Sequence, residues 1–441
     1  MRLHQKLFFG LLVLLPTQLG LHFWPDWASV LGRRVDYLSP TIYLTDVLLI
    51  ALLASWFFDD FYHKFLISNF QFLIKRKNFK ILIFKFAPIL LFAALNIFVA
   101  VSKSAALYKW VKALEFIGLA WYILKTKPNP ALATFYLSLG VLYSSIIAIF
   151  QFLFQHSLGG PLRWLGERTF SVDTPGIAKI DFPGIPDLGR GLSLVPLLRP
   201  YATFPHPNVL GGYLAVLLPL LVNLPIRQIL RPGSGRVRPI LPMGKKTQEN
   251  VLKFFKWTTI VLGTVALVLS FSRSAICVGA LATVIAVAKI KYPPRKIILI
   301  FTLLLLVLGS LFLVQKASER NESLVVRQQL NLAALKIWQQ SPLVGVGLGN
   351  FLVKLPEALP FRQIYFLQPV HNIYFLILAE TGTVGFILFL WLIWWVIAKK
   401  KPFNIYRLPF IIFLLLGLID HYPLTLQQGQ ILFAVLLALA V

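Results

Sequence analysis

The chain has 441 residues, of which 58% are hydrophobic and only 13% are charged, yet its formal net charge is +27. A water-soluble protein of this length could not bury so much apolar surface, so the composition excludes that class and predicts a polytopic membrane protein. The basic residues fall in short loops between apolar runs, so the charge indicates membrane topology and not a nucleic-acid partner. The single cysteine, Cys277, excludes a disulfide within the chain.

Apolar runs of spanning length predict an all-α bundle of about twelve transmembrane helices. No small-residue cleavage site follows the first run, so we expect it to be retained as a helix and not removed as a signal peptide. The runs cover residues 7–23, 39–57, 81–101, 105–124, 131–152, 208–225, 255–271, 274–290, 297–315, 372–398, 408–420 and 430–441.

The charges of the loops predict the direction of the helices. With the N-terminus in the cytoplasm, the cytoplasmic segments hold more than half of the 43 Lys and Arg residues and only three acidic ones, Asp59, Asp60 and Glu249. Positively charged loops stay in the cytoplasm, so we expect a multi-pass protein of the inner (cytoplasmic) membrane in this orientation.

We expect one integral membrane domain with helices in three blocks, 1–152, 208–314 and 372–441. Two large extracytoplasmic loops, 153–207 and 315–371, separate the blocks, and long ordered loops tend to be functional. The second loop contains ESLVVRQQLNLAALKIWQQSP, whose apolar residues Val326, Leu330, Ala334 and Ile337 fall on one helical stripe. We expect this amphipathic helix to lie flat at the outer interface.

Two arginines lie near predicted span ends on the outer side. RPYATFPHPNVLGGYLA holds Arg199 and begins a helix at Asn208, a residue type common at N-caps. An arginine that snorkels to the headgroups is the simplest alternative for Arg199. SFSRSA places Arg273 in a tight turn between two spans, where the positive-inside rule makes an outer arginine unusual. A third arginine, Arg327, lies on the amphipathic helix.

The stretch QPVHNIYFLILAETGTVGF opens with His371 and Asn372 and continues as an apolar helix. Gly382 and Gly385 lie three apart, so we expect them on one helical face that a neighbouring helix can approach closely. Glu380 within the span costs roughly 2.5–3.5 kcal/mol, so it should face a cavity or a partner. Downstream, DHYPLTLQQGQ begins with Asp420 and His421, which either orient a reacting group or form an ordinary polar turn.

Three arginines, one histidine and two asparagines would thus face the same compartment. Guanidinium groups make bidentate, charge-assisted hydrogen bonds to phosphates, which suits a diphosphate. A neutral imidazole nearby can accept the proton of a sugar hydroxyl. The run GVGLGN lacks the phase and the lysine of a nucleotide site. No Asp-x-Asp pair and no His/Cys/Asp spacing typical of metals occurs, so we expect no cofactor and no metal.

These stretches, in this order, resemble the O-antigen ligase and polymerase superfamily of bacterial membrane glycosyltransferases. His371-Asn372 followed by Gly382-x-x-Gly385 is similar to the ligases' His-Asn…Gly-x-x-Gly pattern. ATFPHPNVLGGYLA, SFSRSA and SPLVGVGLGNF resemble the family's other three blocks, and the resemblance covers about residues 199–430.

The resemblance implies an integral membrane transferase that needs neither a nucleotide sugar nor a metal. Its donor would be a polyprenyl-diphosphate-linked glycan on the outer leaflet, and its acceptor a glycan, lipid or protein. Three residues would act in catalysis: His371 as the base, with Arg273 and Arg327 on the diphosphate. The substrate-binding residues would be Arg199, Asn208 and Asn372.

Other functions stay open at this stage. A transporter or flippase of lipid-linked glycans fits about twelve spans, but transporters concentrate polar groups at the midplane and contain two related halves. A metal-dependent transferase would have to use Asp26 or Asp36 in the first outer loop. Within the favoured class, the sequence does not choose between polymerase, ligase and protein O-glycosylation.

Overall fold

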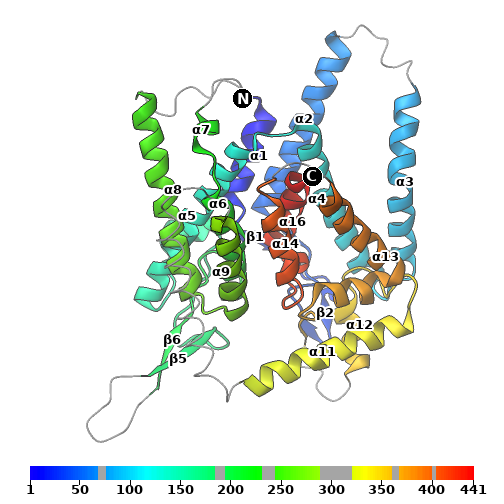
Figure 1. The fold of residues 1–441 in the computed structure, drawn as a ribbon. Helices are drawn as coiled ribbons and strands as arrows, with labels where there is room; N and C mark the ends of the chain where they lie inside the picture. Colours follow the sequence, from blue (N-terminus) through cyan, green and yellow to red (C-terminus); the bar gives the residue numbers. More distant parts are fainter. Residues whose placement is uncertain (68–75, 184–193, 231–243, 289–319, 360–366, 400–403) are drawn as a thin grey trace, which may run out of the picture.

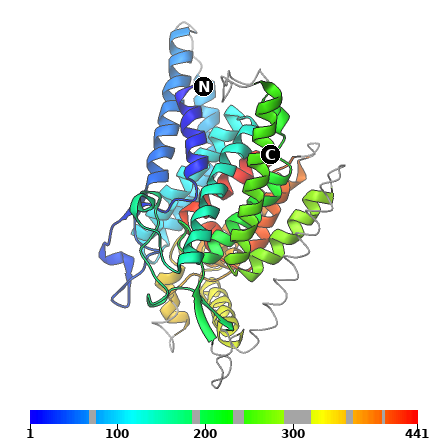
Figure 2. The same cartoon turned by 90° about the vertical axis from the view of Figure 1, so that its left-hand side faces the viewer.

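The computed structural model describes residues 1–67, 76–183, 194–230, 244–288, 320–359, 367–399 and 404–441. Most of the described helices run along one direction and form a bundle with two distinct ends (Figure 1). The N-terminus and α7 lie at one end, and α11, α12 and the β5–β6 hairpin lie at the other. The view turned by 90° shows the same separation (Figure 2).

The longer helices account for most of the bundle. They are α1 (Leu3–Leu14), α2 (Leu44–Ile67), α3 (Arg76–Phe98), α4 (Lys103–Thr126), α5 (Pro130–Phe154), α6 (Pro207–Val222), α8 (Lys245–Leu269), α9 (Arg273–Ala288), α11 (Arg320–Gln340), α13 (Ile373–Ala398), α14 (Arg407–Leu416) and α16 (Gln427–Ala440).

Shorter elements connect them. The short helices are α7 (Ile226–Ile229), α12 (Phe351–Ala358) and α15 (Tyr422–Thr425), with 3-10 turns at Asp26–Ala28 and Gly160–Leu165. Three antiparallel pairs of strands complete the described fold: β1 (Gly20–His22) with β4 (Thr41–Tyr43), β2 (Ser29–Val30) with β3 (Arg33–Arg34), and β5 (Lys179–Pro183) with β6 (Leu194–Leu198).

The fold is mainly helical, as predicted, with three short strand pairs that were not predicted, and every predicted apolar run except 297–315 overlaps a helix. That run lies outside the described residues. Three described helices, α5, α8 and α13, are long and apolar enough to cross a membrane, while α1, α6, α9, α14, α16 and the Ala87–Phe98 part of α3 are apolar but shorter. The count of about twelve spans therefore stays a prediction.

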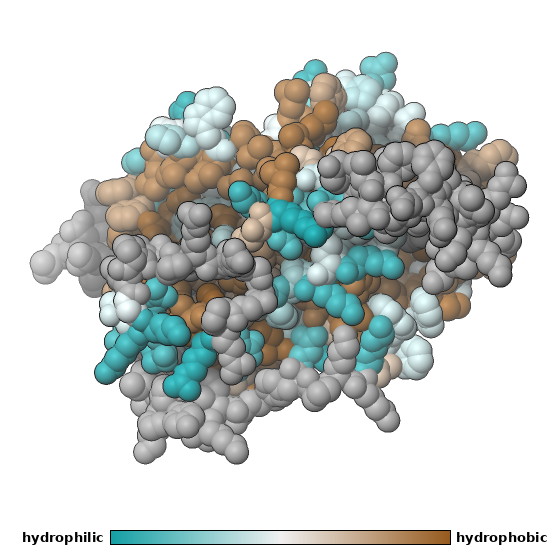
Figure 3. Space-filling view, turned by 90° about the horizontal axis from the view of Figure 1, so that it is seen from above, coloured by the Kyte–Doolittle hydropathy of each residue, from teal (hydrophilic) through white to brown (hydrophobic). Residues whose placement is uncertain are grey.

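The surface of the bundle has the apolar character that lipid contact requires. Leu91 and Phe98 on α3 are each 72% exposed, and Trp391 and Trp394 on α13 are 56% and 63% exposed. In water such side chains would be costly to expose over a wide surface, whereas in hydrocarbon they are not. Seen from the end where the N-terminus lies, hydrophilic side chains gather toward the middle of the face and hydrophobic ones lie toward its upper margin (Figure 3).

Helix α6 lies in the middle of the core, and nearly all of its side chains are buried. It packs against α8, α9 and α14. A Cβ atom at Gly212 would lie 1.7 Å from the Tyr422 hydroxyl, so only glycine lets α15 approach α6 this closely. This packing brings the start of α6 beside the α8–α9 turn and the α14–α15 connection.

Helix α11 (Arg320–Gln340) forms where the sequence predicts an amphipathic helix. It runs across the lower end of the bundle, transverse to the long helices (Figure 1). Leu330, Ala334 and Ile337 are almost fully buried, in a core that α12 and the first part of α13 share. The apolar stripe therefore packs against other helices of the protein, and this packing holds α11 in place.

Helix α13 is broken at Gly382, whose backbone has φ 66° and ψ −172°. The expected glycine face on a continuous helix is therefore wrong at Gly382. The break frees backbone groups that the preceding loop binds: the Thr383 amide donates to the Pro342 carbonyl at 2.8 Å, and the Gly347 amide donates to the Glu380 carbonyl at 3.0 Å. The close approach is thus made by a loop, and a Cβ at Gly382 would lie 2.4 Å from the Leu343 backbone.

Glu380 has a partner in the same region. Its Oε1 accepts a hydrogen bond from the amide of Phe351, the first residue of α12, at 3.2 Å. A carboxylate at the amino end of a helix is stabilised by the helix dipole and by the free amides there. Glu380 therefore joins α13 to α12, which explains a carboxylate in a span without a catalytic role.

Candidate active site

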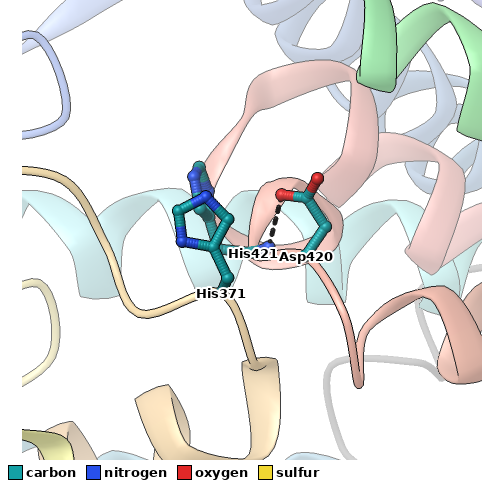
Figure 4. A group of neighbouring side chains, drawn as sticks. All are labelled: His371, Asp420 and His421. Carbon is teal, nitrogen blue, oxygen red and sulfur yellow. Dashed lines mark hydrogen bonds between the residues drawn. The ribbon is translucent and has the colours of Figure 1, made fainter. Parts of the chain in front are cut away.

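Three side chains with proton-accepting or metal-binding atoms meet at the end of the bundle that carries α11: His371, Asp420 and His421 (Figure 4). We call them the histidine group. Their ligand-type atoms all lie within 4.8 Å of one another. The rings of His371 and His421 are 5.1 Å apart and inclined at 72°. The backbone amide of His421 donates to Asp420 at 2.8 Å.

The local fold holds His371 at this point. The Ile373 amide at the start of α13 donates to the Gly417 carbonyl at the end of α14, at 2.8 Å. Asn372 is the N-cap of α13, and its Oδ1 accepts hydrogen bonds from the amides of Tyr374 and Phe375 at 2.9 and 3.2 Å. The asparagine oxygen is therefore used by the helix, so the predicted substrate-binding role of Asn372 remains a prediction.

A second group, the arginine group, consists of Arg199, Asn208 and Arg273. Arg199 follows β6, and its Nε donates to the Ser270 carbonyl at 2.9 Å while an Nη donates to Asn208 Oδ1 at 2.7 Å. Burial lowers the pKa of Arg199 to about 10, and the nearby charge of Arg273 lowers it further. The guanidinium groups of Arg199 and Arg273 therefore lie close enough for their like charges to repel.

The helix that Asn208 was expected to cap begins two residues earlier. His206 is the N-cap of α6, and its Nδ1 accepts a hydrogen bond from the Asn208 amide at 3.1 Å. Pro207 occupies the first helical position, where its missing N–H is not needed, and this fixes the cap at residue 206. Asn208 is thereby free to hold Arg199 with its side chain.

His206 connects the two groups. Burial lowers its pKa to about 4, with a further decrease from Arg199. Asp420 acts in the opposite direction, and His371 and Arg168 add to the decrease. The pKa of His206 therefore depends on charges in both the arginine group and the histidine group.

Arg327 approaches the histidine group from α11. Its Nη1 donates to the Ile419 carbonyl at 3.1 Å, directly before Asp420. Burial lowers the pKa of His371, which Asp420 partly offsets and which the charge of Arg327 reinforces. The structure thus brings Arg199, Arg273, Arg327 and His371 into one region of the molecule, although they come from four separate segments.

The imidazoles of this region are neutral near pH 7. Burial lowers the pKa of His421 to about 4; Asp420 opposes this decrease, while His371, His206 and Arg327 reinforce it. Neutral imidazoles can accept or donate a proton in a hydrogen bond. Asp420 is the one carboxylate in the two groups, so the positive charge of the arginines exceeds the negative charge beside them.

The histidine group offers two imidazoles and a carboxylate, a donor set that binds divalent metals in other proteins. No metal spacing is visible in the sequence because residue 371 and residues 420–421 belong to distant segments. The three arginines oppose a dication here, since like charges repel strongly at a partly buried site. Asp26 and Asp36, the acidic residues of the metal-dependent alternative, are both exposed and lie outside the group.

Four residues in or beside the site carried little or no signal in the sequence. His206 lies within the stretch that holds Arg199 but had no partner there. Asp420 and His421 were a polar pair with two interpretations. Tyr37, whose ring lies 5.4 Å from that of His421 in a T-shaped contact, comes from the segment before β4 and gave no signal at all.

Comparison with known families gives a match that covers part of the chain. The family model described as O-antigen ligase, Wzy_C, matches residues 258–390. This segment is similar to the O-antigen ligase family. The match confirms the resemblance to the O-antigen ligase and polymerase superfamily, and together with the apolar helices it identifies a membrane protein.

The matched segment contains Arg273, Arg327, His371 and Asn372. The rest of the site lies outside it: Arg199, His206 and Asn208 come before the matched segment, and Asp420 and His421 come after it. No curated protein and no solved structure matches the chain. The candidate site therefore combines residues from inside and outside the matched segment.

Proposed function

We propose that the protein is a membrane glycosyltransferase of the O-antigen ligase type. It transfers a glycan from a polyprenyl-diphosphate carrier to an acceptor hydroxyl at the extracytoplasmic face of the inner membrane, without a metal. The observation that carries this proposal is that arginines lie at both groups: Arg199 donates to Asn208 at the start of α6, and Arg327 donates to the Ile419 carbonyl directly before Asp420. Positive charge and proton acceptors lie side by side there, as this reaction requires.

The arginine group suits the diphosphate of the donor. Arg199 and Arg273 lie close together, and the repulsion between their like charges is relieved when a dianion binds between them. Arg327 adds a third positive charge near His371. Such charges stabilise the negative charge that builds on the leaving diphosphate in the transition state.

The histidine group suits the acceptor. The acceptor hydroxyl oxygen attacks the anomeric carbon, and the bond from that carbon to the diphosphate oxygen breaks with its electron pair on the oxygen. The hydroxyl proton passes to the neutral imidazole of His371 and then to solvent. The products are the new glycoside and polyprenyl diphosphate. General base catalysis of this kind contributes roughly 10²–10⁴-fold to the rate.

The two ends of the bundle support the proposed orientation. The N-terminus and α7, which belong to the basic set of segments, lie at one end, and α11 and the β5–β6 hairpin lie at the other (Figure 1). Arg327 on α11 contacts the α14–α15 connection, so the site belongs to the second end. This is the end that the charge distribution assigns to the extracytoplasmic side.

The test is complementation of a deletion strain of the native host. We expect His371→Ala and Arg273→Ala each to reduce surface glycan at least about 100-fold, because each removes a group needed in the transition state. Arg163→Ala, which changes an exposed arginine of the first large loop, is the matched control and should restore normal glycan. Normal glycan from both site variants, with the protein present in the membrane, would disprove the proposal.

The same strain identifies the type of reaction. Single repeat units left on the carrier indicate a polymerase, and long chains left on the carrier indicate a ligase. In sealed vesicles, movement of the lipid-linked glycan without bond cleavage would favour a flippase. Full activity in EDTA is expected, and its loss would point to a metal at the histidine group.

A further inference from the structure

Two neutral histidines of the site are held in opposite tautomers. His206 Nδ1 accepts the Asn208 amide hydrogen at 3.1 Å, so this nitrogen carries a lone pair. A neutral imidazole has one N–H, which must then be on Nε2. The free ring nitrogen of His206 is therefore a hydrogen-bond donor.

His421 has the reverse arrangement. Its Nδ1 lies 2.7 Å from Thr425 Oγ1, and the same hydroxyl donates to the His421 carbonyl at 3.1 Å. A threonine hydroxyl has one hydrogen, so both contacts are hydrogen bonds only when Nδ1 carries the ring proton. The free nitrogen of His421, Nε2, is then a hydrogen-bond acceptor.

The two histidines also face different partners. His206 is next to Arg199 through Asn208, and the charge of Arg199 acts on it directly. His421 lies against His371 and Asp420, with Tyr37 and Thr425 on other sides. A hydrogen-bond donor, the Nε2–H of His206, thus lies beside the arginine group. A hydrogen-bond acceptor, Nε2 of His421, lies within the histidine group.

We propose that His206 and His421 divide the site between its two substrates: the Nε2–H of His206 binds the diphosphate of the donor, and the Nε2 lone pair of His421 accepts a hydrogen bond from a second hydroxyl of the acceptor, next to the one that attacks. This assignment rests on the proposed function. A diphosphate oxygen only accepts hydrogen bonds, so it matches the N–H of His206 and would be repelled by the lone pair of His421. The attacking hydroxyl gives its one hydrogen to His371, so a neighbouring hydroxyl of the acceptor sugar is the group that can donate to the lone pair of His421.

Asparagine is the matched replacement at both positions. In His206→Asn, the side-chain oxygen can still cap α6, since asparagine is a favoured N-cap, but the Nε2–H is gone. In His421→Asn, the side-chain amide can still donate to Thr425, but the acceptor nitrogen is gone. Each variant therefore removes one hydrogen-bonding function and keeps the local fold.

The first experiment measures the tautomers. The full-length protein, labelled with 15N-histidine, is studied by NMR in lipid nanodiscs, and the two asparagine variants assign the signals. We expect Nε2-protonated His206 and Nδ1-protonated His421. Thr425→Ser should keep the His421 tautomer, while Thr425→Val should turn it into a mixture. The opposite tautomer in either histidine overturns the proposal, whatever the enzyme does.

The second experiment measures binding of inorganic pyrophosphate to the full-length protein near pH 7.5. Loss of one hydrogen bond to a charged group predicts an affinity about tenfold lower in His206→Asn. His421→Asn should bind pyrophosphate like the wild type but make less surface glycan. No binding by the wild type, or equal loss in both variants, overturns the proposal.

These results separate the two proposals. Correct tautomers and the expected pyrophosphate pattern, together with normal glycan in the deletion strain, would refute glycan transfer by this protein. Glycan lost on deletion, together with a different tautomer in either histidine, would refute only the division of the site.

Discussion

Two polar regions of this molecule differ in how their charges are satisfied. Inside the bundle, Lys112 on α4 pairs with Asp46 on α2 at 2.5 Å and with Glu115 at 3.3 Å, and Gln427 on α16 donates to Asp46. At the end of the bundle, Arg199 and Arg327 donate to neutral oxygens of Ser270, Asn208 and Ile419 among the described residues. The charges of the interior region are paired with opposite charges, whereas these two arginines are held by neutral oxygens.

This difference distinguishes buried polar residues that stabilise the fold from those proposed to act in the reaction. A buried charge that meets an opposite charge joins helices. A cluster of one sign, arranged by neutral hydrogen-bond acceptors, is stable only because it is partly solvated or binds an ion. The comparison predicts that interior variants lose stability first and site variants lose transfer first.

The largest expected effect is on stability. Lys112→Met leaves the carboxylates of Asp46 and Glu115 without their cation, and breaking a buried pair in this way costs about 3–5 kcal/mol. We expect a large decrease in Tm in detergent, or little protein in the membrane. Lys125→Met, at an exposed position of the same helix, is the control and should change Tm little. Equal Tm values for the two variants would show that the buried charge pairs of Lys112 do not stabilise the fold, and would contradict the comparison of the two regions.

The next effect is the pH dependence of stability. The pKa values of His206 and His421 are lowered to about 4 in the folded protein, against about 6.5 in the unfolded chain. Between these values the unfolded state binds more protons, so stability is lost as pH falls from 6.5 toward 4. At pH 5 the loss is ~2 kcal/mol per histidine.

The measurement is Tm at pH 7 and pH 5 for the wild type and for the double variant His206→Asn/His421→Asn. The double variant should lose less stability between the two pH values. An equally steep decrease in both proteins would show that these imidazoles are not buried in their neutral form.

A smaller effect is expected on the reaction. Arg199 uses two different nitrogens for Ser270 and Asn208, and a lysine cannot reproduce this planar geometry. We expect Arg199→Lys to reduce surface glycan about tenfold and to lower Tm only slightly, since lysine keeps the positive charge and the change loses about one hydrogen bond, or about 1 kcal/mol. A large decrease in Tm, with a normal amount of surface glycan per molecule of protein in the membrane, would show that Arg199 stabilises the fold and does not act in the reaction.

The smallest expected effect separates the two roles of Asn372. If it acts as the N-cap of α13, Asn372→Ala should cost about 1 kcal/mol of stability, and Asn372→Asp should restore it, because aspartate is an equally good cap. If it binds substrate, both variants should lower transfer at unchanged Tm. Thermal unfolding and surface glycan, measured on the same two variants, distinguish the outcomes.

Much of the fold follows from apolar runs, because a segment of this length has no stable alternative to a helix in lipid. The stripe of Leu330, Ala334 and Ile337 likewise predicts α11 correctly. The break at Gly382 does not follow, since the sequence stays apolar on both sides of it. Its cause is the loop 341–350, whose backbone takes the place of the helical hydrogen bonds.

The arginines of the site are predictable one by one, since arginine at a tight outer turn is costly without a purpose. Their meeting with the histidine group is not, because it depends on α6, α9, α11 and the α14–α15 connection packing together. The cap of α6 shows how a local rule can mislead. Asn208 is the better N-cap by residue type, but Pro207 moves the helix start to His206.

The most direct test uses the carrier-linked glycan that accumulates in a deletion strain. It is extracted and given, with acceptor, to the purified protein in nanodiscs, and released polyprenyl diphosphate is measured. The wild type should release the diphosphate as the glycan is joined to the acceptor, and His371→Ala and Arg273→Ala should release less than about one hundredth of it. Equal release by the wild type and by either variant would contradict a site built from the arginine and histidine groups.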